Sequence, residues 1–107
     1  MFFFAEADMK GRSIAPGVDI KVVSGDNAML SFVTLTPGSS VPIHSHPHEQ
    51  LGLVLDGEFV FVIGDERRVV KQGDTYVIPS NVLHGVPEVP VLSKALDVFS
   101  PPRQEYR

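Results

Sequence analysis

Short runs rich in Val, Ile, Leu, Phe and Thr alternate along the chain with clusters of glycine, proline, asparagine and aspartate. Such runs favour strands, and no stretch of useful length has the hydrophobic period of an amphipathic helix. We expect strands over Val18–Val23, Met29–Thr36, Leu51–Leu55, Glu58–Ile63, Arg67–Val70, Thr75–Ile78 and Leu92–Phe99. Many short strands at this spacing predict an all-β fold, either a sandwich or a barrel.

Turn residues separate these strands. Asp56-Gly57 predicts a two-residue β-hairpin, because a type I′ turn needs a positive φ at both central positions and this dipeptide tolerates it. We expect further turns or loops at Gly25-Asp26-Asn27, Pro37-Gly38, Gly64-Asp65, Gly73-Asp74, Pro79 to Asn81 and Pro87 to Pro90. The chain shows no internal repeat and no linker, so we expect one domain over residues 1–107.

The segment around Leu51–Leu55 predicts a sheet with an apolar outer face. Side chains alternate along a strand, so Leu51, Leu53 and Leu55 point outward if Gln50 faces the interior. A stripe of three leucines is too apolar to remain in contact with water. We therefore expect a homodimer built on this face, with Phe2 to Phe4 contributing.

Composition and charge narrow the function classes. The formal net charge is −4, and no Lys/Arg cluster is larger than Arg67-Arg68, which argues against a nucleic acid partner. The absence of cysteine excludes disulfides and thiolate metal sites and fits a reducing compartment. The apolar M-F-F-F start is followed at once by Glu6 and Asp8, so it does not read as a signal peptide. We expect a cytoplasmic protein with no membrane span, since no apolar run approaches the roughly 20 residues required.

Three of the four histidines lie in the segment H-S-H-P-H-E-Q, residues 44–50. In a regular strand His44, His46 and Gln50 would share one face, whereas Pro47 is expected to distort the strand and rotate His48 away. Together with a third imidazole, these residues would form a set of three imidazoles and one oxygen ligand. Such a set suits a single divalent transition metal ion: Ni, Fe, Mn, Zn, Co or Cu.

His84 could complete such a metal site. An isolated histidine is, however, more often a hydrogen-bonded structural residue. His48 and Glu49 could equally belong to an exposed polar loop without a chemical role.

The spacing of these residues resembles the two cupin motifs. Residues 38–57 run G-x5-H-x-H-x3-Q-x6-G, with Gln50 where the first motif usually has Glu, and residues 73–84 run G-x5-P-x-N-x2-H. Asn81 stands where the second motif commonly has Gly, and Glu88 where it commonly has Asn; the first departure changes a loop and the second a residue that is not a ligand. The resemblance implies a single-domain cupin, a jelly-roll barrel of two antiparallel sheets (the double-stranded β-helix). Its central metal would be held by His44, His46, Gln50 and His84.

A narrower resemblance involves the tail D-V-F-S-P-P-R-Q-E-Y together with H-S-H-P-H-E-Q and the M-F-F start. The combination is similar to KdgF-type cupins, which convert 4,5-unsaturated monouronates from pectin and alginate breakdown into linear keto forms. That family's functional Asp, Phe and Arg fall on Asp97, Phe99 and Arg103. The resemblance implies a small anionic sugar substrate and an isomerase-type enzyme.

The resemblance also implies a role for each residue of the tail. Asp97 would shuttle a proton, Phe99 would pack against the sugar ring, and Arg103 would pair with the substrate carboxylate. Each charged residue has a simpler alternative. Asp97 could be a structural carboxylate that caps backbone amides or orients a ligand histidine, and Arg103 could be a surface charge.

Two other function classes remain open. The same ligands permit another cupin metalloenzyme, such as a dioxygenase that uses Fe or Mn. A third class is a catalytically silent cupin that binds a sugar or another small molecule.

Overall fold

The computed structural model describes residues 2–107, so Met1 and its part of the M-F-F start lie outside the described residues. Within residues 2–107 there are ten strands and two short 3₁₀ helices. In chain order they are η1 (Glu6–Asp8), β1 (Lys10–Ala15), β2 (Val18–Ser24), β3 (Met29–Leu35), β4 (Val41–His44), β5 (Glu49–Asp56), β6 (Glu58–Ile63), β7 (Glu66–Lys71), β8 (Thr75–Ile78), β9 (His84–Glu88), β10 (Ser93–Ser100) and η2 (Gln104–Tyr106). The all-β prediction is confirmed.

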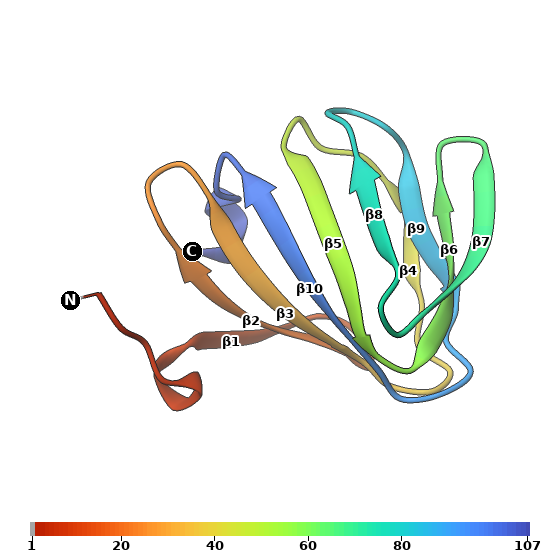
Figure 1. The fold of residues 1–107 in the computed structure, drawn as a ribbon, viewed down its shortest axis with the longest axis horizontal. Helices are drawn as coiled ribbons and strands as arrows, with labels where there is room; N and C mark the ends of the chain where they lie inside the picture. Colours follow the sequence, from red (N-terminus) through yellow and green to blue (C-terminus); the bar gives the residue numbers. More distant parts are fainter. Residues whose placement is uncertain (1) are drawn as a thin grey trace.

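The strands form two antiparallel sheets that face each other (Figure 1). The larger sheet has the order β1-β2-β3-β10-β5-β8, and the smaller one has the order β4-β9-β6-β7. Consecutive strands often lie in different sheets: β4 belongs to the smaller sheet and β5 to the larger one. This arrangement is the predicted jelly-roll barrel of two antiparallel sheets. No helix in the described chain is long and apolar enough to cross a membrane.

All seven expected strands are present, and the structure has three further strands that the sequence pattern did not predict. β1 is an edge strand whose residues are almost all exposed, so it lacks the hydrophobic alternation of a buried strand. β4 and β9 each contain a proline. The expected loop at 87–90 is therefore wrong for Pro87 and Glu88, which lie in β9 where the pairing with β6 has a register irregularity. A bulge of this kind accommodates a residue that cannot donate to the ladder.

The hairpin expected at Asp56-Gly57 is also wrong. β5 and β6 belong to different sheets, so the dipeptide carries the chain across the barrel. Gly57 has φ +81°, whereas Asp56 does not adopt a positive φ. A Cβ at position 57 would lie 2.5 Å from the carbonyl oxygen of Leu92, so the close approach of two segments also requires glycine. The tight hairpin is instead at Gly64-Asp65, between β6 and β7.

Apolar side chains from both layers pack together between the sheets. Val54 and Ile78 of the larger sheet and Phe59 of the smaller sheet belong to one buried cluster. On the opposite face of β5, Leu51 and Leu55 remain 44% and 38% exposed. The predicted alternation of β5, with Gln50 and Val54 inward and the leucines outward, is therefore confirmed.

Candidate functional site

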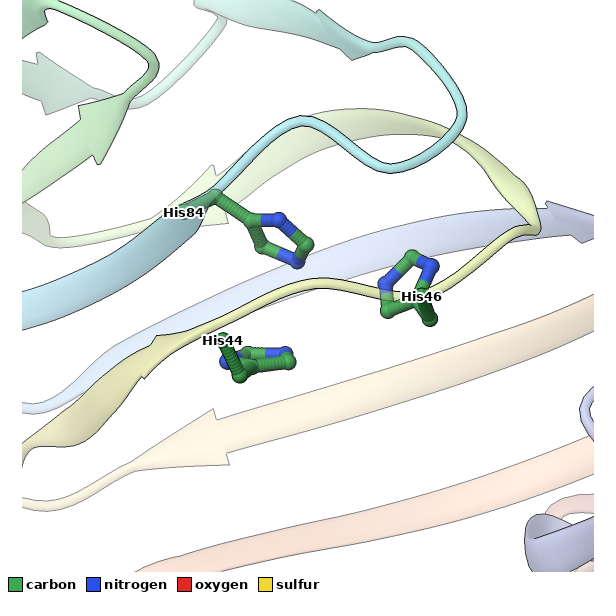
Figure 2. Close-up of side chains that lie close together, drawn as sticks. All are labelled: His44, His46 and His84. Atoms are coloured by element: carbon green, nitrogen blue, oxygen red, sulfur yellow. The ribbon is translucent and has the colours of Figure 1, made fainter.

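His44 and His84 occupy directly opposed positions on the neighbouring strands β4 and β9. His46 lies in the connection from β4 to β5, and its ring faces both of them (Figure 2). One ring nitrogen from each histidine lies within 4.8 Å of the others. The three imidazoles can therefore bind one metal ion, as the motif spacing predicts.

The path of the chain between these histidines differs from one regular strand. His44 ends β4 in the smaller sheet, whereas Gln50 lies in β5 of the larger sheet, and residues 45–48 are not in a strand. The side chains converge because this connection crosses the barrel, and not because they alternate on one ladder. The backbone N–H of Asn81 donates to the His46 carbonyl at 2.8 Å and thereby fixes the connection. Asn81 has φ +66°, a left-handed conformation that asparagine tolerates better than most residues.

Each of the three histidines is oriented by a backbone carbonyl. The Nδ1 atoms of His44, His46 and His84 lie 2.8, 3.0 and 2.9 Å from the carbonyl oxygens of Pro42, His48 and Val82. Because a carbonyl oxygen can only accept, each Nδ1 carries the hydrogen. In a neutral ring Nε2 is then left with a lone pair, which is the form that a metal requires.

Burial keeps two of these rings neutral. Desolvation lowers the pKa of His84 to about 4, and it also lowers the pKa of His46, with the charge of Arg103 as the second cause. A buried imidazole is costly to protonate because its charged form loses hydration. His46 and His84 are therefore uncharged near neutral pH and available as metal ligands.

The contact between His46 and Gln50 indicates where a cation would fit. His46 Nε2 lies 3.2 Å from Gln50 Oε1, and the amide of Gln50 also hydrogen bonds to Asp97. With Nδ1 donating to the carbonyl of His48, a neutral His46 presents Nε2 as an acceptor, so two acceptors face each other. A cation that accepts both lone pairs relieves this repulsion. The donor set of three imidazoles and one amide oxygen thus fits a divalent transition metal.

Asp97 lies next to this cluster, on the inward face of β10, and is 7% exposed. Its carboxylate accepts a hydrogen bond of 2.6 Å from the hydroxyl of Tyr76. Burial raises the pKa of Asp97 to about 6, and hydrogen bonds from Tyr76 and Gln50 oppose that rise. A carboxyl group with such a pKa can both take up and release a proton near neutrality.

Phe99 follows Asp97 on the same face of β10, and Arg103 lies just beyond the strand, before η2. The guanidinium of Arg103 lies 5.4 Å from the centre of the Phe99 ring and 4.4 Å from that of Tyr106. Arg103 is 8% exposed, so the alternative of a surface charge does not describe it. The ring of Phe99 in turn contacts the ring of His46 edge-on, with 5.7 Å between centroids.

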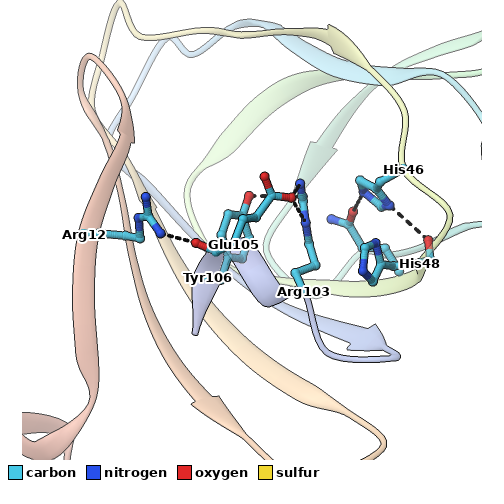
Figure 3. A network of polar contacts seen from close by, with 7 residues as sticks. Arg12, His46, His48, Arg103, Glu105 and Tyr106 are labelled. Carbon is cyan, nitrogen blue, oxygen red and sulfur yellow. Dashed lines mark hydrogen bonds and ion pairs between the residues drawn. The ribbon is translucent and has the colours of Figure 1, made fainter.

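The short helix η2 holds Arg103 in place (Figure 3). The Nε and Nη2 atoms of Arg103 donate to the carboxylate of Glu105, and its Nη1 donates to the hydroxyl of Tyr106 at 3.1 Å. Arg12 of β1 donates to the backbone carbonyl of Glu105 and links this helix to the edge of the larger sheet. The three donors used leave one N–H on each terminal nitrogen of Arg103 for a further carboxylate.

These residues surround one cavity of about 390 Å³ between the two sheets, a size that suits a small ligand. Of the seven residues singled out in the sequence, six line it: His44, Gln50, His84, Asp97, Phe99 and Arg103. His46 does not line the cavity but contacts Gln50 and Phe99, which do. The structure thus brings all seven together, and their roles remain predictions.

Among the residues of the cavity wall that sequence reasoning missed are Arg12, Tyr76, Glu105 and Tyr106. The alternation of β8 places Tyr76 on the same inward face as Ile78, which was the only signal for it. His48, whose role the sequence left open, contributes its carbonyl to His46 and has a buried Nδ1 without a hydrogen bond partner among the described residues. Glu49 is exposed.

The fold and the histidine cluster agree with the comparisons with known proteins. Residues 31–90 match the cupin domain family. The chain therefore belongs to the cupin family. Within it, the chain is 30% identical to the pectin degradation protein KdgF of Dickeya dadantii over 106 residues, which cover 97% of this chain and 96% of that protein.

Two solved structures are similar over nearly the whole chain. KdgF from Halomonas sp. superposes with a TM-score of 0.86 at 28% identity and covers 96% of both chains. An RmlC-like cupin from Shewanella frigidimarina superposes with a TM-score of 0.92 at 24% identity and covers 100% of this chain and 96% of its own, which shows the shared fold. Together with the histidine cluster, the likeness to KdgF fits a cupin metalloenzyme.

Proposed function

We propose that the protein converts 4,5-unsaturated monouronates from pectin or alginate breakdown into linear keto sugar acids. The observation that carries this proposal is the convergence of Asp97, Phe99 and Arg103 on the cavity that His44 and His84 also line. An acid–base group, an aromatic surface and a carboxylate-binding fork are the three parts that this substrate requires. The likeness to KdgF over nearly the full chain supports the same reaction.

In this proposal one divalent metal is held by His44, His46, Gln50 and His84. Neutral imidazoles and an amide oxygen leave its full charge of +2 uncompensated, whereas a glutamate at position 50 would reduce it to +1. When bound, the metal supplies a Lewis acid and a template for the carboxylate and a neighbouring sugar oxygen. The choice of Gln50 therefore favours an anionic ligand.

Arg103 and Phe99 capture and orient the sugar acid. Arg103 is already fixed by Glu105 and Tyr106, so binding of the substrate carboxylate costs little further side-chain ordering. The ring of Phe99 offers a flat apolar surface beside the guanidinium, against which one face of the sugar packs. The two residues thus fix both the position and the tilt of the ring relative to Asp97.

Asp97 moves the proton. Its carboxylate takes the proton of the anomeric hydroxyl as the bond between C1 and the ring oxygen breaks, which gives an aldehyde at C1 and an enolate over C4, C5 and the former ring oxygen. The same carboxyl group then delivers the proton to C4, and a ketone forms at C5. The proton taken from the anomeric hydroxyl is returned to C4, so the substrate gains and loses no atom. One acid–base residue therefore suffices for the isomerisation.

The experiment that tests the proposal is loss of the 4,5-unsaturated chromophore when metal-loaded protein is added to an unsaturated monouronate. Binding of the uronate without turnover would instead favour a silent sugar-binding cupin. Oxygen consumption with a catechol, thiol or flavonol substrate would favour a dioxygenase.

We also propose that the protein forms a homodimer through the outer face of the larger sheet. A row of apolar residues crosses five of its strands in register: Val23, Leu30, Val98, Leu51 and Val77. Within this row Leu51 and Val77 are 44% and 54% exposed. Phe2 and Phe3 are 93% and 89% exposed near the N-terminus and would add apolar surface to the contact.

A further inference from the structure

Three residues of the larger sheet lie in one row beneath the cavity. Asp97 of β10 is paired with Gly52 of β5, and Gly52 is paired with Tyr76 of β8. Asp97 and Tyr76 are therefore on strands that do not touch, and β5 lies between them. Their side chains nevertheless meet, because position 52 carries no side chain.

The ring of Tyr76 occupies the space above Gly52. A Cβ on residue 52 would lie 2.1 Å from both Cε1 and Cζ of Tyr76 and 2.4 Å from its hydroxyl oxygen. Side-chain atoms do not approach a Cβ so closely, so any other residue would displace the ring. Phe61 of the opposite sheet supports the ring with an edge-on contact of 4.7 Å between centroids. Gly52 has no positive φ, so the need for glycine here comes from space alone.

The contact that results is a hydrogen bond between two buried groups. The hydroxyl of Tyr76 donates to Asp97 Oδ1 at 2.6 Å, and the two residues are 9% and 7% exposed. Burial raises the pKa of Tyr76 well above its ordinary value, so the phenol keeps its proton and stays a donor. The amide of Gln50 also hydrogen bonds to this carboxylate, but the carboxylate cannot turn about its Cβ–Cγ bond without breaking the hydrogen bond from Tyr76.

We propose that Tyr76 is a positioning residue that holds the Asp97 carboxylate in the orientation from which it exchanges a proton with the substrate, and that Gly52 is required for this contact. The inference rests on the proposed function for the proton step, while the contact itself does not depend on it. Tyr76 acts through Asp97 and is not expected to touch the reacting atoms. Proton transfer demands a donor within hydrogen bond reach, so loss of this restraint should affect turnover more than binding.

The first test is the kinetics of metal-loaded Tyr76→Phe. This variant keeps the ring and its packing and loses only the hydroxyl, and we expect kcat to fall about tenfold or more with KM and metal content unchanged. In an Asp97→Asn background the same substitution should have no further effect on kcat, because the two residues act as a unit. An equal fall in both backgrounds, or an unchanged kcat in Tyr76→Phe, would overturn the proposal.

Gly52→Ala supplies an independent route to the same loss. The added methyl group should displace the Tyr76 ring and lower kcat at least as much as Tyr76→Phe, and the double variant should be no worse than Gly52→Ala alone. Gly11→Ala on β1 is the matched control, because its Cβ would meet its nearest neighbours at ordinary distances of 3.7 and 3.8 Å. Wild-type kcat in a folded Gly52→Ala protein would contradict the required role of glycine.

A crystal structure of metal-loaded Tyr76→Phe separates this inference from the proposed function. If the wild-type protein does not turn over an unsaturated uronate, the proposed function fails, and the orientation of Asp97 still decides the positioning role. We expect the Asp97 carboxylate to rotate or to adopt two orientations in the variant. An Asp97 side chain that keeps its wild-type orientation and order without the phenol hydroxyl would overturn the inference whatever the activity.

Discussion

His44 and His84 face each other across the paired strands β4 and β9, with their ring centroids 4.4 Å apart. The two residues come from different sequence motifs, and antiparallel pairing of the two strands alone brings them together. The backbone carbonyls that orient them belong to the same two segments, two residues before each histidine. The strand pair is therefore the rigid base of the candidate metal centre, to which His46 and Gln50 are added from the crossing chain.

The first prediction concerns this centre. We expect His44→Ala combined with His46→Ala to abolish stoichiometric metal binding, because two of the four ligands are lost and the remaining pair cannot complete a tetrahedral or larger shell. Elemental analysis of purified protein measures it. His48→Ala is the matched control and should retain metal, since only its backbone carbonyl serves His46. Undiminished metal in the double variant would falsify the ligand assignment.

The second prediction concerns Asp97. Asp97→Asn keeps the size of the side chain and can still accept the hydrogen bond from Tyr76, but it cannot carry a proton to the substrate. We expect metal content and fold to be retained and kcat to fall roughly 10²-fold or more, the scale of a lost general acid–base group. Steady-state kinetics on an unsaturated uronate provides the measurement. A wild-type kcat would reduce Asp97 to a structural carboxylate that orients Gln50.

The third prediction concerns substrate capture. Arg103→Ala removes the fork that binds the carboxylate, so we expect KM to rise roughly tenfold or more, with a smaller loss in kcat where the sugar is also misoriented. Arg67→Ala is the matched control, because Arg67 is an exposed arginine on β7. We expect the KM of that control to equal the wild-type value. An unchanged KM in Arg103→Ala would contradict the role of Arg103.

The strands were predictable wherever hydrophobic alternation records burial on one face. β5 is the clearest case, because its inward and outward residues follow directly from the sequence. β1 has no such alternation, since it is an exposed edge, and β9 contains a proline that normally argues against an inner strand. The hairpin predicted at Asp56-Gly57 was wrong for a different reason. A turn signal is local, whereas the sheet to which β5 and β6 each belong depends on strands distant in the sequence.

The candidate site was predictable as a set of residues and not as a geometry. Motif spacing and the tail singled out the seven residues, but alternation along one strand gave the wrong path between His44 and Gln50. Tyr76 could not be found in this way, because its contact with Asp97 crosses an intervening strand. That contact is possible because Gly52 has no side chain. A glycine in a strand does not by itself indicate which residue fills the space.

The fourth prediction concerns assembly. We expect a dimer mass by light scattering at micromolar protein concentration, because the apolar outer row of the larger sheet favours burial. Leu51→Glu places a charge within this row and should shift the protein toward monomer. Val69→Glu is the control, since Val69 is 56% exposed on β7 of the other sheet. A monomer mass for the unmodified protein would count against the dimer.

The proposed reaction is tested most directly by following the ultraviolet absorbance of an enzymatically prepared 4,5-unsaturated monouronate after addition of metal-loaded protein. The account predicts that the chromophore disappears with wild-type protein, at a rate proportional to protein concentration, as C4 gains its proton and the double bond is lost. It also predicts that, with the His44→Ala, His46→Ala double variant, the absorbance falls no faster than in buffer alone. A wild-type protein that contains stoichiometric metal and leaves the absorbance of both pectin-derived and alginate-derived substrate unchanged would contradict it.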